Sequence, residues 1–282
     1  MRRVRIALLG AILAAAVGFP ATASAATGDM VFYGVFSGEA EVPPVATEAS
    51  GSIYVIVNSA RTKLTYVATF RGLSGPVVAS HLHVGAVGEA GPVVLPLNSG
   101  RAPMIATKYA ANVSPAGGVD DFGDLVEAML AGRIYANLHT AANPPGEVRA
   151  QLRFLSGDKV YSGALSGAAE NPPVTTEGTG SAYVILNAAQ TRLTYVVTYR
   201  GLSGPVVAAH SDLAPVGSNG PIIVPLKSGP SAMVGSRYAA DVTPADGVDN
   251  LADAFAEIRA GNTYVNLHTS ANPGGEVRAQ LR

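Results

Sequence analysis

The chain contains no cysteine. This absence excludes structural disulfides, thiolate metal ligands, a cysteine nucleophile and a lipid-modified N-terminal cysteine. Any domain that this chain forms must therefore be stabilised by its own hydrophobic core.

Blocks of like charge are also missing. The 19 basic residues nearly balance the 20 acidic ones, for a formal net charge of −1. A nucleic-acid surface needs a basic patch or stripe, so we expect no nucleic-acid partner.

Motifs for nucleophilic, metalloprotease or phosphate chemistry are absent too. We find no Gly-x-Ser-x-Gly elbow, no His-Glu-x-x-His pair and no phosphate-cradling glycine loop ahead of a helix. We therefore assign no catalytic residues and no residues that bind an organic cofactor. Whether the chain is an enzyme stays open, and the absence of these motifs favours a protein that is not one.

The one long apolar run lies at the N-terminus. It extends from Ile6 to Phe19, follows three arginines, and ends before Ala23-Ser24-Ala25. This order is typical of a secretory signal, so we predict a signal peptide over 1–25, cleavage near Ala25 and export to the periplasm or beyond. An uncleaved anchor is the alternative, but the run is short. We expect no membrane span in the mature form.

An internal repeat covers the remainder of the chain. An offset of 129 residues aligns the two copies without a gap, and Gly146 to Arg153 recurs unchanged as Gly275 to Arg282. We predict two domains over 30–153 and 159–282. Each is near the size that folds alone, and the short linker predicts that they sit close together.

Period-two patterns predict strands. In Leu64 to Phe70, alternate residues form an apolar face, and Val67 interrupts the polar one. Further strands are expected over 52–58, 77–83, 91–97, 133–140 and 147–153. The spacing of Phe122, Val126 and Met129 instead predicts one short helix over 121–130, capped by Asp120 or Asp121.

These patterns favour a mainly β fold. We expect an antiparallel β-sandwich or barrel-like domain with one short helix across its end or edge, duplicated in tandem. The 32 glycines and 19 prolines spread along the chain fit many strands joined by tight turns.

All five histidines lie in the repeated motifs. In the first copy, His81 and His83 leave the same face of a predicted strand, and His139 supplies a third imidazole. Three imidazoles suit copper or zinc, so these residues are candidate metal ligands.

In the second copy, a carboxylate residue, Asp212, occupies the position that aligns with His83. Its candidate set is His210, Asp212 and His268, which favours harder ions and disfavours Cu(I). Its site either differs in metal affinity or is degenerate. For His139 and His268 an alternative stays open, in which the imidazole bonds to backbone and braces a turn.

Carboxylates at matching positions accompany the histidines in both copies. Glu147 and Arg149 share a strand face, which favours a cross-strand ion pair, with a carboxylate that orients a histidine as the alternative. Glu41 and Glu170, each before a Pro-Pro pair, are expected to hold a loop or contact a ligand.

Three stretches, in order, resemble the CHRD (chordin-type) domain family. They are Glu41 to Ser52, Ser80 to Val94, and Ala131 to Leu152, with counterparts in copy two except at Ser211-Asp212. The resemblance implies an extracellular β-sandwich-like module in an exported microbial protein. A fainter likeness of the histidine set is to copper-zinc superoxide dismutase, and it extends to one site only.

We interpret the chain as a non-catalytic binding module with a candidate copper or zinc site. Its expected partner is a metal ion or an extracellular protein or polymer. Two alternatives are a metal-dependent redox enzyme with a dismutase-like histidine site, and a purely structural or adhesive surface protein.

Overall fold

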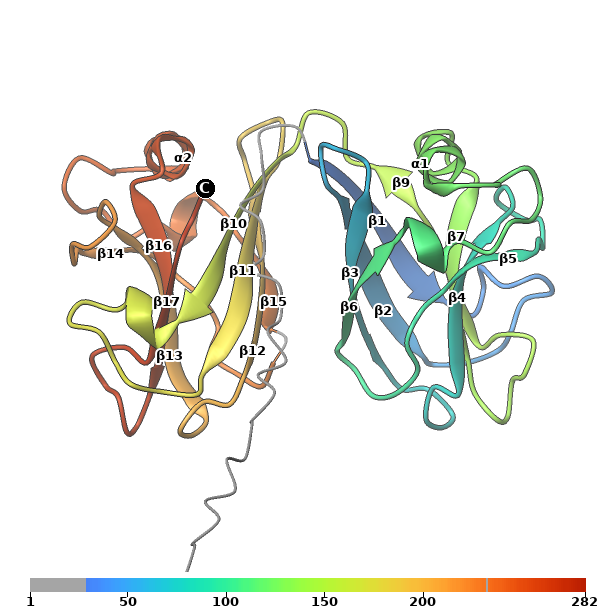
Figure 1. Cartoon of the computed structure of the whole chain (residues 1–282), viewed down its shortest axis with the longest axis horizontal. Coiled ribbons are helices and arrows are strands. Elements are labelled where there is room, and N and C mark those ends of the chain that lie inside the picture. Colours follow the sequence, from blue (N-terminus) through green and yellow to red (C-terminus); the bar gives the residue numbers. More distant parts are fainter. Residues whose placement is uncertain (1–28, 232) are drawn as a thin grey trace, which may run out of the picture.

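A computed structural model describes residues 29–231 and 233–282 of the chain. The predicted signal peptide, residues 1–25, lies outside the described residues. The described chain forms two domains side by side, each built on one antiparallel sheet that curls into a near-barrel (Figure 1).

The sheet of the first domain follows the order β5-β4-β7-β8-β1-β2-β3-β6, with β9 beside β1. Its strands are β1 (Met30–Ser37), β2 (Ser50–Val57), β3 (Lys63–Arg71), β4 (Ala79–Val84), β5 (Val93–Pro96), β6 (Met104–Tyr109), β7 (Ile134–His139), β8 (Val148–Gln151) and β9 (Arg153–Phe154).

The second domain repeats this topology in the order β14-β13-β16-β17-β10-β11-β12-β15. Its strands are β10 (Lys159–Ser166), β11 (Thr179–Leu186), β12 (Leu193–Arg200), β13 (Val206–Leu213), β14 (Ile222–Pro225), β15 (Met233–Arg237), β16 (Thr263–Thr269) and β17 (Val277–Gln280). The predicted mainly β fold, duplicated in tandem, is confirmed.

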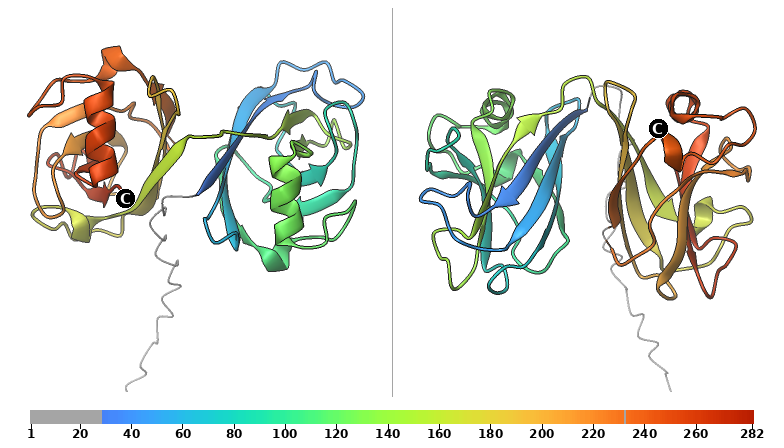
Figure 2. Two further views of the ribbon diagram at one scale, coloured as in Figure 1. Left: turned by 90° about the horizontal axis from the view of Figure 1, so that it is seen from above. Right: turned by 180° about the vertical axis from the view of Figure 1, so that it is seen from behind.

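Each domain carries one α-helix across the end of its barrel, α1 (Phe122–Leu130) and α2 (Leu251–Ala260) (Figure 2). Asp121 is the N-cap of α1 and accepts a hydrogen bond from the backbone N–H of Asp124, as its position before the apolar pattern predicted. No helix of residues 29–231 and 233–282 is long and apolar enough to cross a membrane.

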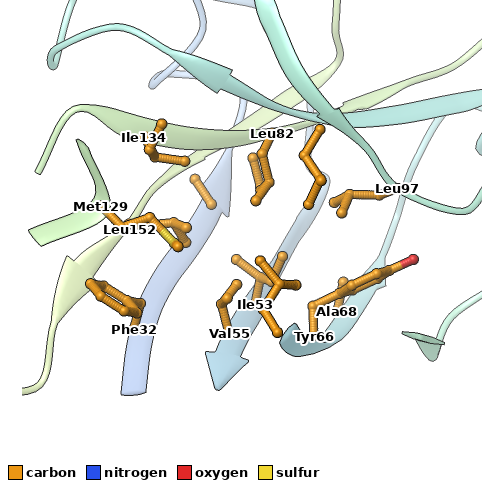
Figure 3. Packing of buried hydrophobic residues seen from close by; sticks show 14 of the residues in the cluster. Phe32, Ile53, Val55, Tyr66, Ala68, Leu82, Leu97, Met129, Ile134 and Leu152 are labelled. Atoms are coloured by element: carbon orange, nitrogen blue, oxygen red, sulfur yellow. The ribbon is translucent and has the colours of Figure 1, made fainter. Parts of the chain in front are cut away.

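The core of the first domain lies inside the curled sheet. Leu64, Tyr66 and Ala68 of β3 point into it, which confirms the alternation expected for that strand. Phe32, Leu82, Met129 and other side chains from β1, β4 and α1 meet them there (Figure 3).

Besides the core inside each domain, a further apolar cluster joins the two domains. It lies on the outer faces of β1, β2 and β3 and of their counterparts β10, β11 and β12. Val67, which broke the polar face of its strand in sequence, is 1% exposed because it packs in this cluster. Its members are Val31, Ile56, Val67, Val160, Tyr183, Ile185 and Val196.

Two reciprocal hydrogen bonds flank this cluster. Tyr54 bonds to Thr194, and its counterpart Tyr183 bonds to Thr65, the counterpart of Thr194. The domains therefore meet through the same surface in each copy, as subunits of a two-fold dimer do. The close placement expected from the short linker is confirmed.

Candidate metal centre

The three first-copy histidines lie on the outer face of β4 and β7, opposite the core. The antiparallel register sets Ala79 against His139, His81 against Asn137 and His83 against Tyr135. Alternation sends Leu82 inward and both β4 histidines outward. His83 and His139 are buried there, and His81 is partly exposed.

The ring nitrogens of these histidines converge. One ligand atom from each of His81, His83 and His139 lies within 4.8 Å of the others, and His81 Nδ1 lies 3.1 Å from His139 Nε2. Because Zn–N bonds are about 2 Å, two nitrogens on one ion lie at most about 4 Å apart. The His81–His139 pair is already at ligand spacing, and His83 needs to approach by roughly an ångström.

Backbone carbonyls orient two of the rings. His83 Nδ1 lies 2.9 Å from the carbonyl oxygen of Gly91, and His139 Nδ1 lies 2.9 Å from that of Pro144. A carbonyl only accepts, so each Nδ1 carries the proton and each Nε2 of the neutral ring has a lone pair. The Nε2 of His139 accepts a hydrogen bond from His81 Nδ1 at 3.1 Å. His83 Nε2 is buried without any hydrogen-bond partner.

His139 and His268 also make the backbone hydrogen bonds that the turn-bracing alternative expects. His139 bonds to Pro144, and His268 bonds in the same way to the carbonyl of Pro273 at 3.0 Å. The two interpretations are compatible, because the brace uses Nδ1 and leaves Nε2 for a ligand. Such a backbone bond to the second ring nitrogen is what usually orients a metal-bound histidine.

The electrostatics of the cluster favour neutral imidazoles. Burial, together with the neighbouring His139 and His83 rings, lowers the pKa of His81 to about 4. Burial also lowers the pKa of His83. Rings that are neutral at pH 7 can bind a metal without first losing a proton.

Tyr135 and Arg149 stack behind His83. The His83 and Tyr135 ring centroids are 4.9 Å apart with an interplanar angle of 8°, and the Arg149 Cζ lies 3.5 Å from the Tyr135 centroid. Tyr135 also accepts a hydrogen bond from the N–H of Gly91, the residue that holds the His83 ring. The stack fixes the plane of His83 and places a cation two rings from the centre.

The expected cross-strand ion pair is wrong, because in the described residues neither Glu147 nor Arg149 is part of an ion pair. Arg149 instead donates to the carbonyls of Ala86 and Glu89 at 2.7 Å and to Gln151 at 2.8 Å. The guanidinium therefore holds the loop between β4 and β5 over the polar face.

Glu147 is fully buried and serves as an anchor for three segments. It accepts hydrogen bonds from the Ser74 backbone and hydroxyl, from Thr140 at 2.6 Å and from Thr47 at 3.0 Å. Burial opposes its ionisation, but these hydrogen bonds outweigh burial and lower the pKa of Glu147 to about 2. Its partners are hydroxyls and backbone, not a histidine.

Sequence reasoning missed a buried acid–amide pair beside the histidines. Asn137 donates from Nδ2 to Glu41 Oε2 at 3.3 Å, while Glu41 Oε1 and Asn137 Oδ1 have no partner. Burial raises the pKa of Glu41 to about 7, with Arg149 and Asn137 opposing the rise. Glu41 thus ties its loop to β7, one of the two roles expected for it. The signal for the pair was the recurrence of both residues as Glu170 and Asn266.

The second copy arranges its set differently. His210 Nδ1 bonds to Asp212 Oδ1 at 2.8 Å, and the His210 and His268 ring centroids are 4.5 Å apart. His268 Nε2 is buried without a partner. Within the described part of the chain, only the first-copy histidines form a cluster of three or more candidate ligands at this spacing.

Comparisons with known proteins identify the same family in both copies of the repeat. The model of the CHRD domain family matches residues 32–152 and 161–281. Chordin from Danio rerio is 28% identical over 169 residues, which is 54% of this chain but 17% of chordin, so the chain spans under a fifth of that relative. No solved structure was found to match. With two matches that together cover most of its length, the chain belongs to the CHRD domain family.

Proposed function

We propose that this tandem CHRD protein is an exported, non-catalytic binding module whose first domain holds a copper or zinc ion. His81, His83 and His139 are the proposed ligands. The observation that carries the proposal is the convergence of three ring nitrogens within 4.8 Å on the outer face of β4 and β7.

The surroundings of the cluster support this function. Backbone carbonyls orient the rings of His83 and His139. The Tyr135 ring stacks on His83, and the Arg149 guanidinium lies over Tyr135. Metal-binding histidines are commonly held in this way, because the bond at Nδ1 fixes the tautomer and aims Nε2. A solvated surface histidine needs no such support.

Export is part of the proposal and depends on the predicted signal peptide. A domain without cysteine offers no thiolate, so copper or zinc must be bound by other ligands, such as imidazole nitrogens. Within the described residues, the three histidines of the first domain are the only group of three or more candidate ligands at this spacing.

Calorimetric titration of the purified chain with Zn(II) and Cu(II) tests the proposal. The test variant is His81→Gln with His83→Gln, which leaves the Pro144 brace of His139 intact. The matched control is His210→Gln in the second copy. We expect the first-domain site in the wild type and in the control, and loss of that site in the double variant.

Thermal unfolding followed by circular dichroism checks that the double variant still folds. Equal affinity of wild type and folded double variant for both metals would refute the proposal.

A further inference from the structure

The two copies differ in one of their candidate ligands, His83 in the first copy and Asp212 in the second, and this difference bears on the charge of the ion. We infer that the first-domain centre selects monovalent copper, Cu(I), over divalent ions. The inference rests on the proposed function, since it concerns the metal held by His81, His83 and His139.

The first step is the charge of the ligands. Three neutral imidazoles leave the full charge of the ion uncompensated, +1 for Cu(I) and +2 for Zn(II) or Cu(II). The Born cost of burying an ion rises with the square of its charge. His83 and His139 are only 9% and 8% exposed, so much of the hydration shell is lost on binding.

The second step is that, within the described residues, no carboxylate joins the three rings as a negatively charged ligand for a divalent ion. The Glu147 carboxylate is occupied by hydroxyl and backbone donors. Glu41 interacts with Arg149 and Asn137. Of residues 29–231 and 233–282, the only histidine paired with a carboxylate is His210 in the other domain.

The third step is the cation behind the site. Arg149 lies on Tyr135, and Tyr135 lies on His83, so the guanidinium faces the centre through two stacked rings. A buried positive charge repels a second positive charge, and the repulsion is greater for a divalent ion than for a monovalent one. Imidazole binds copper and zinc alike, so charge decides between them.

The second domain provides a comparison on the same scaffold. Its Tyr264 and Arg278 keep the same stack, with the Arg278 Cζ 3.3 Å from the ring centroid. Asp212, the counterpart of His83, is 2% exposed and places a carboxylate at the centre. This centre therefore favours divalent ions, and one residue, histidine or aspartate, sets the preference.

Two reciprocal variants of the full chain test the inference, His83→Asp and Asp212→His. Each creates an arrangement that the other copy already contains, so the fold tolerates both. Cu(I) affinity is measured anaerobically by competition with a chromophoric Cu(I) chelator, and Zn(II) affinity is measured separately with a zinc indicator.

We expect His83→Asp to lower the Cu(I) affinity about 10–100-fold, the range typical of altered metal surroundings, without lowering the Zn(II) affinity. We expect Asp212→His to add a second Cu(I) per chain.

If His83→Asp weakens Zn(II) as much as Cu(I), or Asp212→His adds no Cu(I), charge selection is refuted while the metal site stands. If the wild type binds neither ion, the proposed function fails and the inference fails with it.

Discussion

Replacement of Glu147 by glutamine is expected to remove one of the largest single contributions to the stability of the first domain. The carboxylate, which is itself fully buried, accepts hydrogen bonds from the Ser74 N–H and hydroxyl, from Thr140 and from Thr47. Its charge therefore joins two loops to the end of β7. Glutamine keeps the shape but loses the charge that these donors stabilise.

The magnitude follows from the pKa of Glu147. Its fall from 4.5 to about 2 corresponds to about 3 kcal/mol, at about 1.4 kcal/mol per pH unit. Because the pKa is lower in the folded state, this stability is fully present above pH 4.5 and is lost as the pH falls toward 2. Glu147→Gln is therefore expected to cost about 3 kcal/mol at pH 7 and little near pH 2.

Urea unfolding of the wild type and the variant between pH 7 and about pH 2 measures this effect. Glu276→Gln in the second copy is the matched variant, because Glu276 has the same partners and its pKa is also lowered to about 2. Glu48→Gln, at an exposed position, controls for the change in net charge. A variant that loses as much stability on acidification as the wild type would refute the reasoning.

Three further changes have defined outcomes. Glu41→Gln is expected to raise the melting temperature above pH 7 and not below pH 4.5. The pKa of Glu41 is raised to about 7 by burial, so the stability that Glu41 contributes below pH 4.5 is lost as the pH rises from 4.5 to about 7, and a glutamine N–H can donate to Asn137 Oδ1. Gly146→Ala is expected to lower the melting temperature in thermal unfolding, because φ is 140° there and a Cβ would lie 2.5 Å from the Asn137 amide. Val67→Asp is expected to split thermal unfolding into two calorimetric transitions, since the burial of valine contributes about 1.5–3 kcal/mol and a charge there separates the domains.

Much of the fold could be predicted because its signals are local. Alternation in Leu64 to Phe70 reports a half-buried strand, and Asp121 marks the start of the helix. The strand β1 carried no such signal. Phe32 and Phe36 face the core, while Val31, the neighbour of Phe32, faces the other domain, so both faces are apolar and the period of two is lost. The strand β6 was not predicted either.

The candidate site could be predicted only in part, because only some of its signals are local in the sequence. His81 and His83 share a face by backbone geometry alone, and repetition of His139 indicated its involvement. Several partners of Glu147 and Arg149, such as Ser74 and the carbonyl of Glu89, lie in loops far away in sequence, and strand alternation says nothing about loops. The shared face suggested an ion pair, whereas each side chain found several partners elsewhere.

The curled sheet separates two uses of its outer surface. The half formed by β1, β2, β3 and β6 packs against the other domain through Val67 and its neighbours, and the half formed by β4, β7 and β8 carries the histidines. Because no strand is shared between the two surfaces, domain contact and ligand binding can vary independently. The exchange of His83 for Asp212 is such a variation, since it leaves the interface cluster unchanged. Val67→Asp, which disrupts the interface, is accordingly expected to leave the metal affinity of the first domain unaltered in the same calorimetric titration.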